Sequence, residues 1–324
     1  MTIYSDEPRA HTDPFLDLAV VPRTEARNPR TVDIDLLPTR AVLELLHAED
    51  EIVPGAVRPV LGTLATIVDE AAWRIRQGGR VHYFGAGSSG RIAMLDAAEL
   101  VPTFGLVPGV VVAHLAGGTG AMERAAEGAE DDRAHGGSDA ADVTASDLVF
   151  GLSASGRTPY VAGALTAAAE RGAFTAVVTC NPGSPLRSLA RVAMVADTGP
   201  EAIAGSTRLK ATSALKLILN SFSTALMVRL GKTYSNLMVD VTATNHKLRV
   251  RKVRILREAS GGDELACEAA LTQADGDLRV AMAALLAGVD AERARQALSA
   301  ADGNVRGALA ALGVAPTVGL ASAR

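Results

Sequence analysis

The chain has 324 residues, of which 48% are hydrophobic and 21% charged, so it is long and apolar enough for one large domain or two smaller ones. The net charge of −4 gives no general attraction to nucleic acid, and two cysteines are too few for a disulfide framework, which is typical of a reducing compartment. The chain shows no signal-peptide pattern and no run of about 18 apolar residues, so we expect a cytoplasmic protein with no membrane partner.

The first part of the chain predicts an arm followed by helices. Residues 1–38 are polar and rich in proline, with weak periodicity, which indicates an ordered arm more than a domain. Residues 39–47 and 57–77 carry apolar side chains at helical spacing. We therefore assign residues 1–60 to an N-terminal arm with helices.

From residue 79 to about residue 230, short β-branched segments alternate with alanine-rich segments of helical length. Five segments have few charges and predict strands: Val81–Phe84, Val110–Leu115, Leu148–Leu152, Ala176–Thr179 and Val192–Val195. Such strands suit a parallel sheet buried on both faces, and the alternation predicts a doubly wound α/β fold. Ligands of this fold bind beyond the carboxyl ends of the strands. A long apolar helix expected over 206–231 has a wide apolar face that we interpret as packing against a partner subunit.

Two loops that follow strands carry the chemistry of an anion site. The first, Gly85-Ala-Gly-Ser-Ser-Gly-Arg91, leads into a helix predicted over 92–100, and the second, Gly151–Pro159, holds two serines and a threonine. Glycines let the backbone approach a ligand, and the first N–H groups and the dipole of a helix attract an anion. Two such loops predict a phosphorylated small molecule, and their hydroxyls favour a sugar phosphate.

A dinucleotide is the weaker alternative for these loops. The spacing Gly85-x-Gly87-x-x-Gly90 formally meets the dinucleotide fingerprint. That fingerprint also needs an acidic residue about twenty positions on, after the next strand, where this chain has Gly117-Gly118-Thr119. The loop hydroxyls can donate to phosphate oxygens alongside backbone N–H groups, and they need no metal. For either loop alone, a tight turn without a ligand explains the glycines and serines equally well.

Carboxylates are the remaining candidates for acid–base chemistry. The six histidines show no metal-ligand spacing, and Cys180 has no evident base nearby, so we expect no metal site and a buried, unreactive thiol. Glu99 stands in an otherwise apolar segment, where a raised pKa would suit a general acid. Glu130 lies in an acidic segment, 127–132. A carboxylate facing water is the simpler interpretation of either glutamate.

Past Arg257 the composition shifts to Ala, Leu, Asp and Arg with no strand signal. Residues 270–285 repeat in residues 297–312 at an offset of 27, and each copy predicts a helix, an Asp-Gly turn and a second helix. The pattern resembles ubiquitin-associated-type helical modules. We expect residues 257–324 to form a small helical domain with a structural or docking role.

Longer motifs occur in six stretches of the chain: residues 24–29, 85–105, 125–131, 153–160, 205–211 and 236–247. In this order they resemble the N-acetylmuramic acid 6-phosphate etherases, over about residues 24–257. The resemblance implies a sugar isomerase (SIS) type of α/β fold over residues 61–256, with the N-terminal helical arm and the small C-terminal helical domain on either side. It also implies a homodimer with shared active sites that works without a cofactor.

The resemblance implies cleavage of the D-lactyl ether of N-acetylmuramic acid 6-phosphate, in cell-wall amino sugar recycling or catabolism. In the opened sugar a carboxylate removes the C2 proton, an acid protonates the departing ether oxygen, and water adds across the double bond. Glu99 matches the proton donor of the family and Glu130 its second catalytic glutamate. Further motif positions, of less certain role, include Asn245 and His246. The substrate-binding residues that it implies are Ser88, Ser89, Gly90, Ser153, Ser155, Gly156, Thr158, Ser206 and Lys210.

One geometric problem and two rival functions stay open. A straight helix over 90–100 would place Glu99 about 14 Å along the axis from the first loop. Either this helix breaks before Glu99, or Glu99 serves the active site of the partner subunit, which we favour. The rivals are a non-catalytic regulator that senses sugar phosphates, as the glucokinase regulatory protein of the same fold family does, and an aldose–ketose isomerase. Release of D-lactate would separate both from an etherase.

Overall fold

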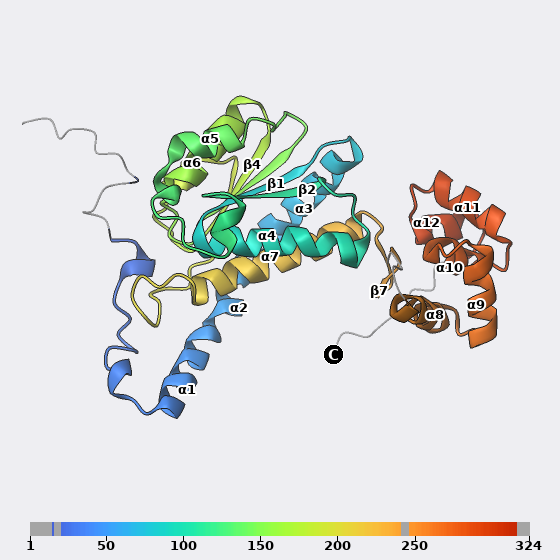
Figure 1. Cartoon of the computed structure of the whole chain (residues 1–324), viewed down its shortest axis with the longest axis horizontal. Coiled ribbons are helices and arrows are strands. Elements are labelled where there is room, and N and C mark those ends of the chain that lie inside the picture. The colour runs from blue at the N-terminus through green and yellow to red at the C-terminus, as the bar shows by residue number, and fades with distance from the viewer. Residues whose placement is uncertain (1–14, 16–20, 241–245, 316–324) are drawn as a thin grey trace, which may run out of the picture. The chain divides into compact units, whose positions relative to one another are not determined.

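The structure is a computed structural model that describes residue 15, residues 21–240 and residues 246–315 (Figure 1). The chain divides into two compact units. Unit 1 comprises residues 1–97 and 109–222, and unit 2 comprises residues 98–108 and 223–324.

A five-stranded parallel sheet with strand order β2-β1-β3-β4-β5 forms the centre of unit 1. Its strands are β1 (Val81–Gly85), β2 (Val111–Leu115), β3 (Leu148–Leu152), β4 (Phe174–Thr179) and β5 (Val192–Val195). All five predicted strands are confirmed to within two residues at each end. The strands β1, β3 and β4 are buried along their whole length, because helices cover both faces of a doubly wound sheet.

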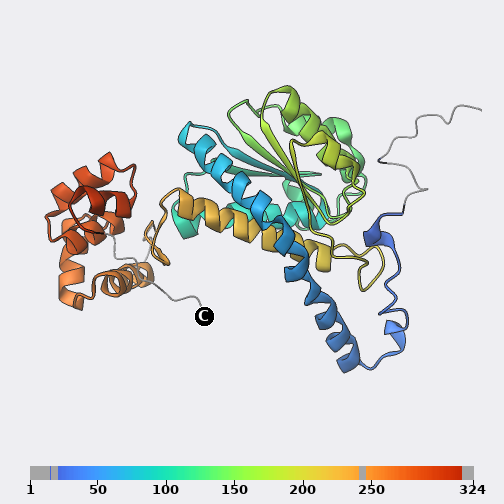
Figure 2. The same cartoon turned by 180° about the vertical axis from the view of Figure 1, so that it is seen from behind.

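Successive side chains of β1 point to opposite faces of the sheet, and each face is covered by helices (Figures 1 and 2). Tyr83 contacts Phe222 edge-on, with 6.3 Å between ring centroids, and Phe84 lies 6.5 Å from Tyr160. The helices α5 (Arg133–Asp139) and α6 (Pro159–Glu170) lie on the side of Tyr160. The other face is covered by α3 (Leu61–Arg76) and by the unit 1 parts of α4 (Gly87–Phe104) and α7 (Lys210–Arg229).

The wide apolar face of α7 is largely core of this chain. Phe222 lies 4.7 Å from Phe150 in an edge-on contact between ring centroids. The other apolar residues of α7 that are fully buried within unit 1 are Ala211, Ala214, Leu215, Ile218 and Leu219. The interpretation that this face packs against a partner subunit is therefore wrong for these residues, because they are already buried within the same chain.

Two helical segments are long and apolar enough to cross a membrane by length and composition alone. They are residues Thr39–Arg76 and Lys210–Arg229, each with a mean hydropathy of 1.3 over its most apolar 18-residue window. The first consists of α1 (Thr39–Asp50), α2 (Ile52–Val57), a 3-10 helix (Arg58–Val60) and α3. Core helices of water-soluble proteins pass the same test, so these segments are weak evidence for a membrane span.

The N-terminal arm, where described, is held against the loop that precedes α7. It contains two 3-10 helices, Arg23–Glu25 and Ile34–Leu36. Asn28 and Thr31 are buried, and they donate hydrogen bonds to the carbonyls of Pro200 (3.2 Å) and Ala202 (2.8 Å). These bonds explain why residues 21–38 are ordered although their sequence has little periodicity.

The described part of unit 2 after residue 223 is helical apart from a two-stranded hairpin. The hairpin pairs β6 (Thr233–Tyr234) with β7 (Leu237–Met238). The helices that follow are α8 (His246–Ser260), α9 (Glu264–Gln273), α10 (Leu278–Ala287), α11 (Ala291–Ala300) and α12 (Val305–Ala311). The residue expected as the start of the C-terminal domain, Arg257, falls inside α8, and α8 contributes Val253, Ile255 and Leu256 to the same core as the later helices.

The internal repeat forms two helix–turn–helix copies, as predicted. The first copy is α9, a turn and α10, and the second is α11, a turn and α12. Asp275 and Asp302 occupy equivalent positions in the two turns, with φ of 53° and 50°. Aspartate tolerates this left-handed conformation better than most residues because its short side chain can hydrogen-bond locally. The two copies of the repeat therefore share their backbone conformation at the turn as well as their sequence pattern.

Candidate active site

Both serine-rich loops begin at the carboxyl edge of the sheet, after two neighbouring strands. The strands β1 and β3 pair in parallel with Gly85 opposite Leu152, so the two loops start side by side. Because β2 lies on the other side of β1, the direction of the strand order changes between β1 and β3. Ligands of open α/β sheets bind at such a switch point. The predicted position of both loops at one sheet edge is confirmed.

The first loop turns so tightly into α4 that two of its glycines are required. A Cβ atom on Gly90 would lie 2.6 Å from the carbonyl oxygen of Gly85, and one on Gly85 would lie 2.8 Å from the nitrogen of Gly90. The helix starts at Gly87, five residues earlier than predicted, so Ser88 and Ser89 belong to its first turn. The first N–H groups of a helix have no acceptor within it. This turn therefore offers backbone donors and two hydroxyls to an anion.

The hydroxyls of the second loop form a network of their own. Ser153 Oγ accepts a hydrogen bond from the backbone N–H of Gly156 at 3.0 Å and lies 2.7 Å from Thr158 Oγ1. Ser153 and Thr158 are buried, whereas Ser155 is partly exposed and accepts from the backbone N–H of Arg157 at 3.3 Å. The loop thus holds a defined shape before any ligand binds.

Two residues that the sequence reasoning missed fix this second loop from the segment after β4. The Asn181 side-chain amide donates to the carbonyl of Ser155 at 2.9 Å, and the Ser184 hydroxyl donates to the carbonyl of Gly156 at 2.7 Å. The signal was present in the sequence, since Asn181 and Ser184 are polar residues within five positions of the end of a buried strand. Gly156 itself has a φ of 71° and sits where a Cβ atom would be 2.3 Å from Ser184.

A pocket of about 190 Å³ lies beside the first loop. Its walls come from the start of α4 and from residues 116–130, which follow β2 and include a 3-10 helix, Thr119–Met122. Six alanines and two glycines line the pocket, and three charged residues, Arg91, Glu127 and Glu130, complete it. Small side chains leave the space open, while the charged groups give it acid–base and ion-binding capacity.

Glu130 lies in a 3-10 helix, Ala129–Asp131, that borders this pocket. Partial burial raises the pKa of Glu130, and the negative charges of Asp131 and Glu127 raise it further. A carboxyl group whose pKa is shifted towards neutrality suits proton transfer. The side chain of Glu130 is nevertheless exposed, as the simpler interpretation of a carboxylate facing water also predicts, so its catalytic role stays a prediction.

Glu99 lies in the same helix that begins at the first loop. The helix α4 runs without interruption from Gly87 to Phe104, so the possibility that it breaks before Glu99 is wrong. Glu99 is exposed, and it is not among the residues that line the pocket holding Glu130. At 1.5 Å per residue Glu99 stands about 14 Å along the axis from Gly90. Supply of Glu99 to the site of a partner subunit stays a prediction.

Lys210, a predicted substrate-binding residue, is engaged in a buried ion pair. Its Nζ atom lies 2.6 Å from Oε2 of Glu49, and only 1% of its side chain is exposed. The backbone N–H groups of Lys210 and Ala211 donate to the carboxylate of Glu201, which is also fully buried. Ser206 is half-buried in the loop between Glu201 and α7. The substrate-binding roles of Lys210 and Ser206 stay predictions.

Glu49 and Glu201 are structural carboxylates that the sequence did not single out. Neither stands in a motif, because their importance comes from partners far away in the sequence, such as Lys210 for Glu49. Two further motif positions cannot be placed: Asn245 lies outside the described residues, and the side chain of His246 is likewise not described.

The remaining candidates behave as core residues. His82 Nδ1 lies 3.0 Å from His114 Nε2, and burial, with His114 nearby, lowers the pKa of His82 to about 4. Cys180 is 1% exposed, and burial raises the pKa of its thiol to about 12, which disfavours a nucleophilic thiolate. Within the described residues, no group of three or more His, Cys, Asp or Glu side chains could hold a metal ion.

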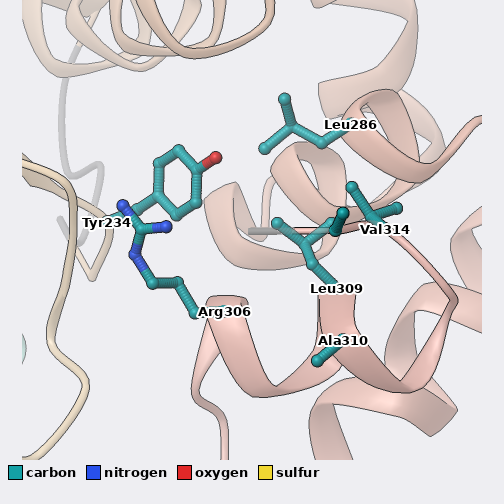
Figure 3. Close-up of a pocket in the computed structure, with 7 residues that line it drawn as sticks. Tyr234, Leu286, Arg306, Leu309, Ala310 and Val314 are labelled. Carbon is teal, nitrogen blue, oxygen red and sulfur yellow. The ribbon is translucent and has the colours of Figure 1, made fainter. Parts of the chain in front are cut away.

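A second pocket, of about 110 Å³, lies in unit 2 (Figure 3). The guanidinium of Arg306 lies over the ring of Tyr234, 5.0 Å from its centroid, and Leu286, Leu309 and Val314 form the apolar wall. No carboxylate, histidine or cysteine lines this pocket, in contrast to the pocket beside the first loop, which Glu127 and Glu130 line. The pocket beside the first loop, which Arg91, Glu127 and Glu130 line, is the candidate active site.

Comparison with known proteins identifies the family. Residues 63–169 match the model of the glucokinase regulatory protein N-terminal SIS domain, and residues 125–225 match that of the SIS domain. The N-acetylmuramic acid 6-phosphate etherase of Thermobifida fusca is 58% identical over 85% of this chain and 90% of its own length. The chain belongs to the N-acetylmuramic acid 6-phosphate etherase family. A second family member, from Yersinia pestis, is 52% identical over 84% of this chain and 93% of its own length.

Comparison with solved structures finds further similar chains. One is a phosphoheptose isomerase from Francisella tularensis, with 18% identity and a TM-score of 0.44, over 57% of this chain and 97% of the isomerase. Another is the NanR protein of Vibrio vulnificus complexed with ManNAc-6P, with 19% identity and a TM-score of 0.43, over 61% of this chain and 67% of NanR.

Proposed function

We propose that this chain is an N-acetylmuramic acid 6-phosphate etherase, which converts its substrate to N-acetylglucosamine 6-phosphate and D-lactate. The observation that carries the proposal is the pocket in unit 1 where Glu130, whose pKa is raised, lines the same space as Gly87 and Arg91 of the first loop, in a chain 58% identical to a protein of that name. We place the protein in the cytoplasm, where its phosphorylated substrate would be retained.

The phosphate of the substrate binds at the carboxyl edge between β1 and β3. Backbone N–H groups at the start of α4, with Ser88, Ser89 and Gly90, approach it from one side, and Ser153, Ser155, Gly156 and Thr158 approach it from the other. The parallel pairing of Gly85 with Leu152 supports this arrangement, because it brings both loops to one edge. The positive end of the α4 dipole favours a dianion at this position.

The chemistry is a β-elimination followed by addition of water. In the opened sugar, Glu130 as a base takes the proton from C2, and the electrons of the C2–H bond form the C2–C3 double bond as the C3–O bond breaks. Glu99 as an acid protonates the departing ether oxygen, which releases D-lactate. Water then adds its hydroxyl to C3 and its proton to C2, which gives N-acetylglucosamine 6-phosphate. Two carboxyl groups and a phosphate anchor suffice for each step.

A homodimer supplies Glu99 to the site of its partner. Glu99 is exposed on the surface of α4, and Leu95, one helical turn earlier, is 46% exposed on the same side of the helix. A second subunit that covered this side of the helix would bury the leucine together with the carboxylate. The continuous α4, which keeps Glu99 far from the first loop of its own chain, supports the same arrangement.

A regulatory protein that binds sugar phosphates without turnover is the second candidate. The specific observation in its favour is the match of residues 63–169 to the N-terminal SIS domain of the glucokinase regulatory protein. A regulator would use the phosphate loops but would need neither glutamate for proton transfer. Loss of Glu130 should then leave its function intact.

The deciding experiment measures D-lactate released by the purified full-length protein from N-acetylmuramic acid 6-phosphate. The matched substrate is unphosphorylated N-acetylmuramic acid, and the matched variant is Glu130→Gln, which keeps the shape of the side chain. An etherase releases D-lactate from the phosphorylated sugar only, and the variant loses this activity. Binding without lactate release would favour the regulator, and interconversion of aldose and ketose phosphates without lactate would favour an isomerase.

A further inference from the structure

The pocket that holds Glu130 contains one basic side chain, Arg91, which the sequence analysis did not single out. Arg91 stands in the second turn of α4, directly after Gly90 of the first loop. Its Nε atom donates to the carbonyl of Ala121 at 2.9 Å, and its Nη2 atom lies 3.4 Å from the carbonyl of Arg124. Arg91 therefore holds the segment that leads to Glu130 and also lines the pocket itself.

These two contacts use only one edge of the guanidinium group. A guanidinium presents five N–H donors in a plane, of which Nε and one N–H of Nη2 form the side edge. The outer edge consists of Nη1 and the second N–H of Nη2, and within the part of the chain that the structure describes no hydrogen bond or ion pair of Nη1 occurs. An outer edge of this kind can bind a carboxylate through two parallel hydrogen bonds.

Two negatively charged side chains line the pocket, so a ligand that carries a carboxylate needs a bond to the guanidinium of Arg91 to bind there. Glu127 and Glu130 also line the pocket, so a ligand with its own carboxylate would meet repulsion unless a cation faced it. Arg91 is the one cation among the lining residues. The other lining residues are alanines and glycines, and alanine is the side chain against which a small methyl group packs without clash.

We propose that Arg91 binds the carboxylate of the lactyl group and thereby selects ether substrates that carry it. This inference rests on the proposed function, because the lactyl group is the part of the substrate that the proposed reaction removes from the sugar. Its carboxylate and methyl group fit the two features of the pocket, a guanidinium edge and an alanine wall. Binding the lactyl group here also places its ether oxygen in the pocket that contains Glu130.

The test compares two substrates in the full-length protein: N-acetylmuramic acid 6-phosphate and its lactyl carboxamide analogue, which keeps the phosphate and the ether. The wild-type protein should prefer the carboxylate about 10–100-fold in kcat/KM, which is the usual worth of hydrogen bonds to a charged group. In Arg91→Met this ratio should fall to about one. Arg91→Lys, which keeps the charge but not the planar edge, should give an intermediate ratio.

A role of Arg91 in holding the segment 121–124 alone would slow both substrates equally. An unchanged preference for the carboxylate in Arg91→Met would therefore overturn the proposal. The control is Arg171→Met, because Arg171 also donates to a backbone carbonyl, that of Ala167 at 2.9 Å, but does not line the pocket. That variant should keep the wild-type ratio, and circular dichroism should show that all variants are folded.

Equilibrium binding gives a second readout that does not depend on turnover. Affinity for N-acetylglucosamine 6-phosphate, which lacks the lactyl group, should be the same in the wild-type protein and in Arg91→Met, to within about twofold. If Arg91→Met weakened binding of this product as much as binding of N-acetylmuramic acid 6-phosphate, a role specific to the lactyl carboxylate would be contradicted. If the wild-type protein released no D-lactate from either substrate, the proposed function itself would fail, whereas lactate release with an unchanged ratio would sink the Arg91 proposal alone.

Discussion

The ammonium of Lys210 lies 2.6 Å from the carboxylate of Glu49, and both side chains are almost completely buried. Two further donors, Arg30 at 2.5 Å and Asn28 at 2.8 Å, bind the same carboxylate. The cluster joins three segments that are far apart in sequence: the N-terminal arm, the helix α1 and the start of α7. Its members hold the loop before α7 in place, so the cluster controls the stability of the region that contains Ser206.

Glu49 makes the stability of unit 1 sensitive to acid. Burial alone would raise the pKa of Glu49, but hydrogen bonds from Arg30 and Lys210 outweigh it, and the pKa is lowered to about 2. Because the pKa of this carboxyl is lower in the folded state, its stabilising contribution is complete above about pH 5. It is lost as the pH falls towards 2, and it amounts to about 3 kcal/mol.

The measurement is urea unfolding from pH 7 to pH 3 in the wild-type protein and in Glu49→Gln. At pH 7 the variant should lose about 3–5 kcal/mol, because the buried Lys210 ammonium loses its counter-charge. Its stability should also fall less steeply below pH 5 than that of the wild type. Glu44→Gln is the control, since Glu44 is exposed and pairs with Arg40 on the surface. Equal acid sensitivity in the wild type and Glu49→Gln would contradict the cluster.

Glu130 should set the acidic limb of the pH–rate profile. As a base Glu130 must be ionised, so kcat/KM falls as the pH drops through its pKa, which burial and the negative charges of Asp131 and Glu127 raise. Asp131→Asn and Glu127→Gln each remove a negative charge that raises this pKa, so each should move the limb to lower pH. Glu123→Gln is the control, because Glu123 is not a cause of the shift. If neither substitution moved the acidic limb of the pH–rate profile, the limb would have to report the ionisation of another group.

Some features of the fold and of the candidate site could be predicted from the sequence, and others could not. The five strands and the position of both loops follow from local pattern, since uncharged β-branched runs and glycine turns have the same meaning wherever they occur. The continuity of α4 through Glu99 was left open, because no residue between Gly90 and Glu99 either breaks or demands a helix. Continuity is decided by packing, which the sequence pattern does not express.

Residues whose role depends on a distant partner were not predictable. Glu49 is one acidic residue among several in α1, and only the fold brings Lys210 to it. Arg91 stands inside a recognised motif, yet its contact with Ala121 comes from the return of the chain after β2. The apolar face of α7 led to a wrong prediction of packing against a partner subunit. An apolar pattern does not say which surface covers it, and here the apolar residues are buried within their own chain.

Gly156 should tolerate no side chain, although glycine at a positive φ is often replaceable at moderate cost. A Cβ atom there would lie 2.3 Å from both Cβ and Oγ of Ser184, so Gly156→Ala must displace the hydroxyl that holds the second loop. We expect KM for the phosphorylated sugar to rise at least tenfold. Gly199→Ala is the matched control, because Gly199 has a similar φ of 69° but no atom within 4 Å of the added Cβ. A similar KM in both variants would show that the Ser184 side chain can be displaced without weakening substrate binding.

The division of labour between the two glutamates can be separated by isotope exchange. Removing a positioned acid or base typically costs about 10²–10⁴ in rate, so Glu99→Gln and Glu130→Gln should both lose kcat while still binding the sugar phosphate. With the acid gone and the base intact, Glu99→Gln should still exchange the C2 proton with heavy water, without releasing lactate. Glu130→Gln should not exchange it. The opposite pattern would reverse the two assignments, and near-normal turnover in both variants would favour the regulatory function.

Mixing the two inactive variants tests whether Glu99 acts in the site of the partner subunit. In a mixed dimer of Glu99→Gln and Glu130→Gln, one site would combine the intact Glu130 of the first chain with the intact Glu99 of the second, and that site would work. If subunits exchange at random, half of the dimers are mixed and about a quarter of wild-type activity should return.

No activity should return if each Glu99 serves its own chain, because every site then lacks one glutamate. The control mixes Glu99→Gln with the double variant Glu99→Gln/Glu130→Gln, which can form no complete site in either arrangement. Subunit exchange itself is verified with differently tagged chains before the assay. Activity that recovers in the first mixture and not in the control would establish the shared site, and absence of recovery despite exchange would require Glu99 to reach the pocket of its own subunit by another route.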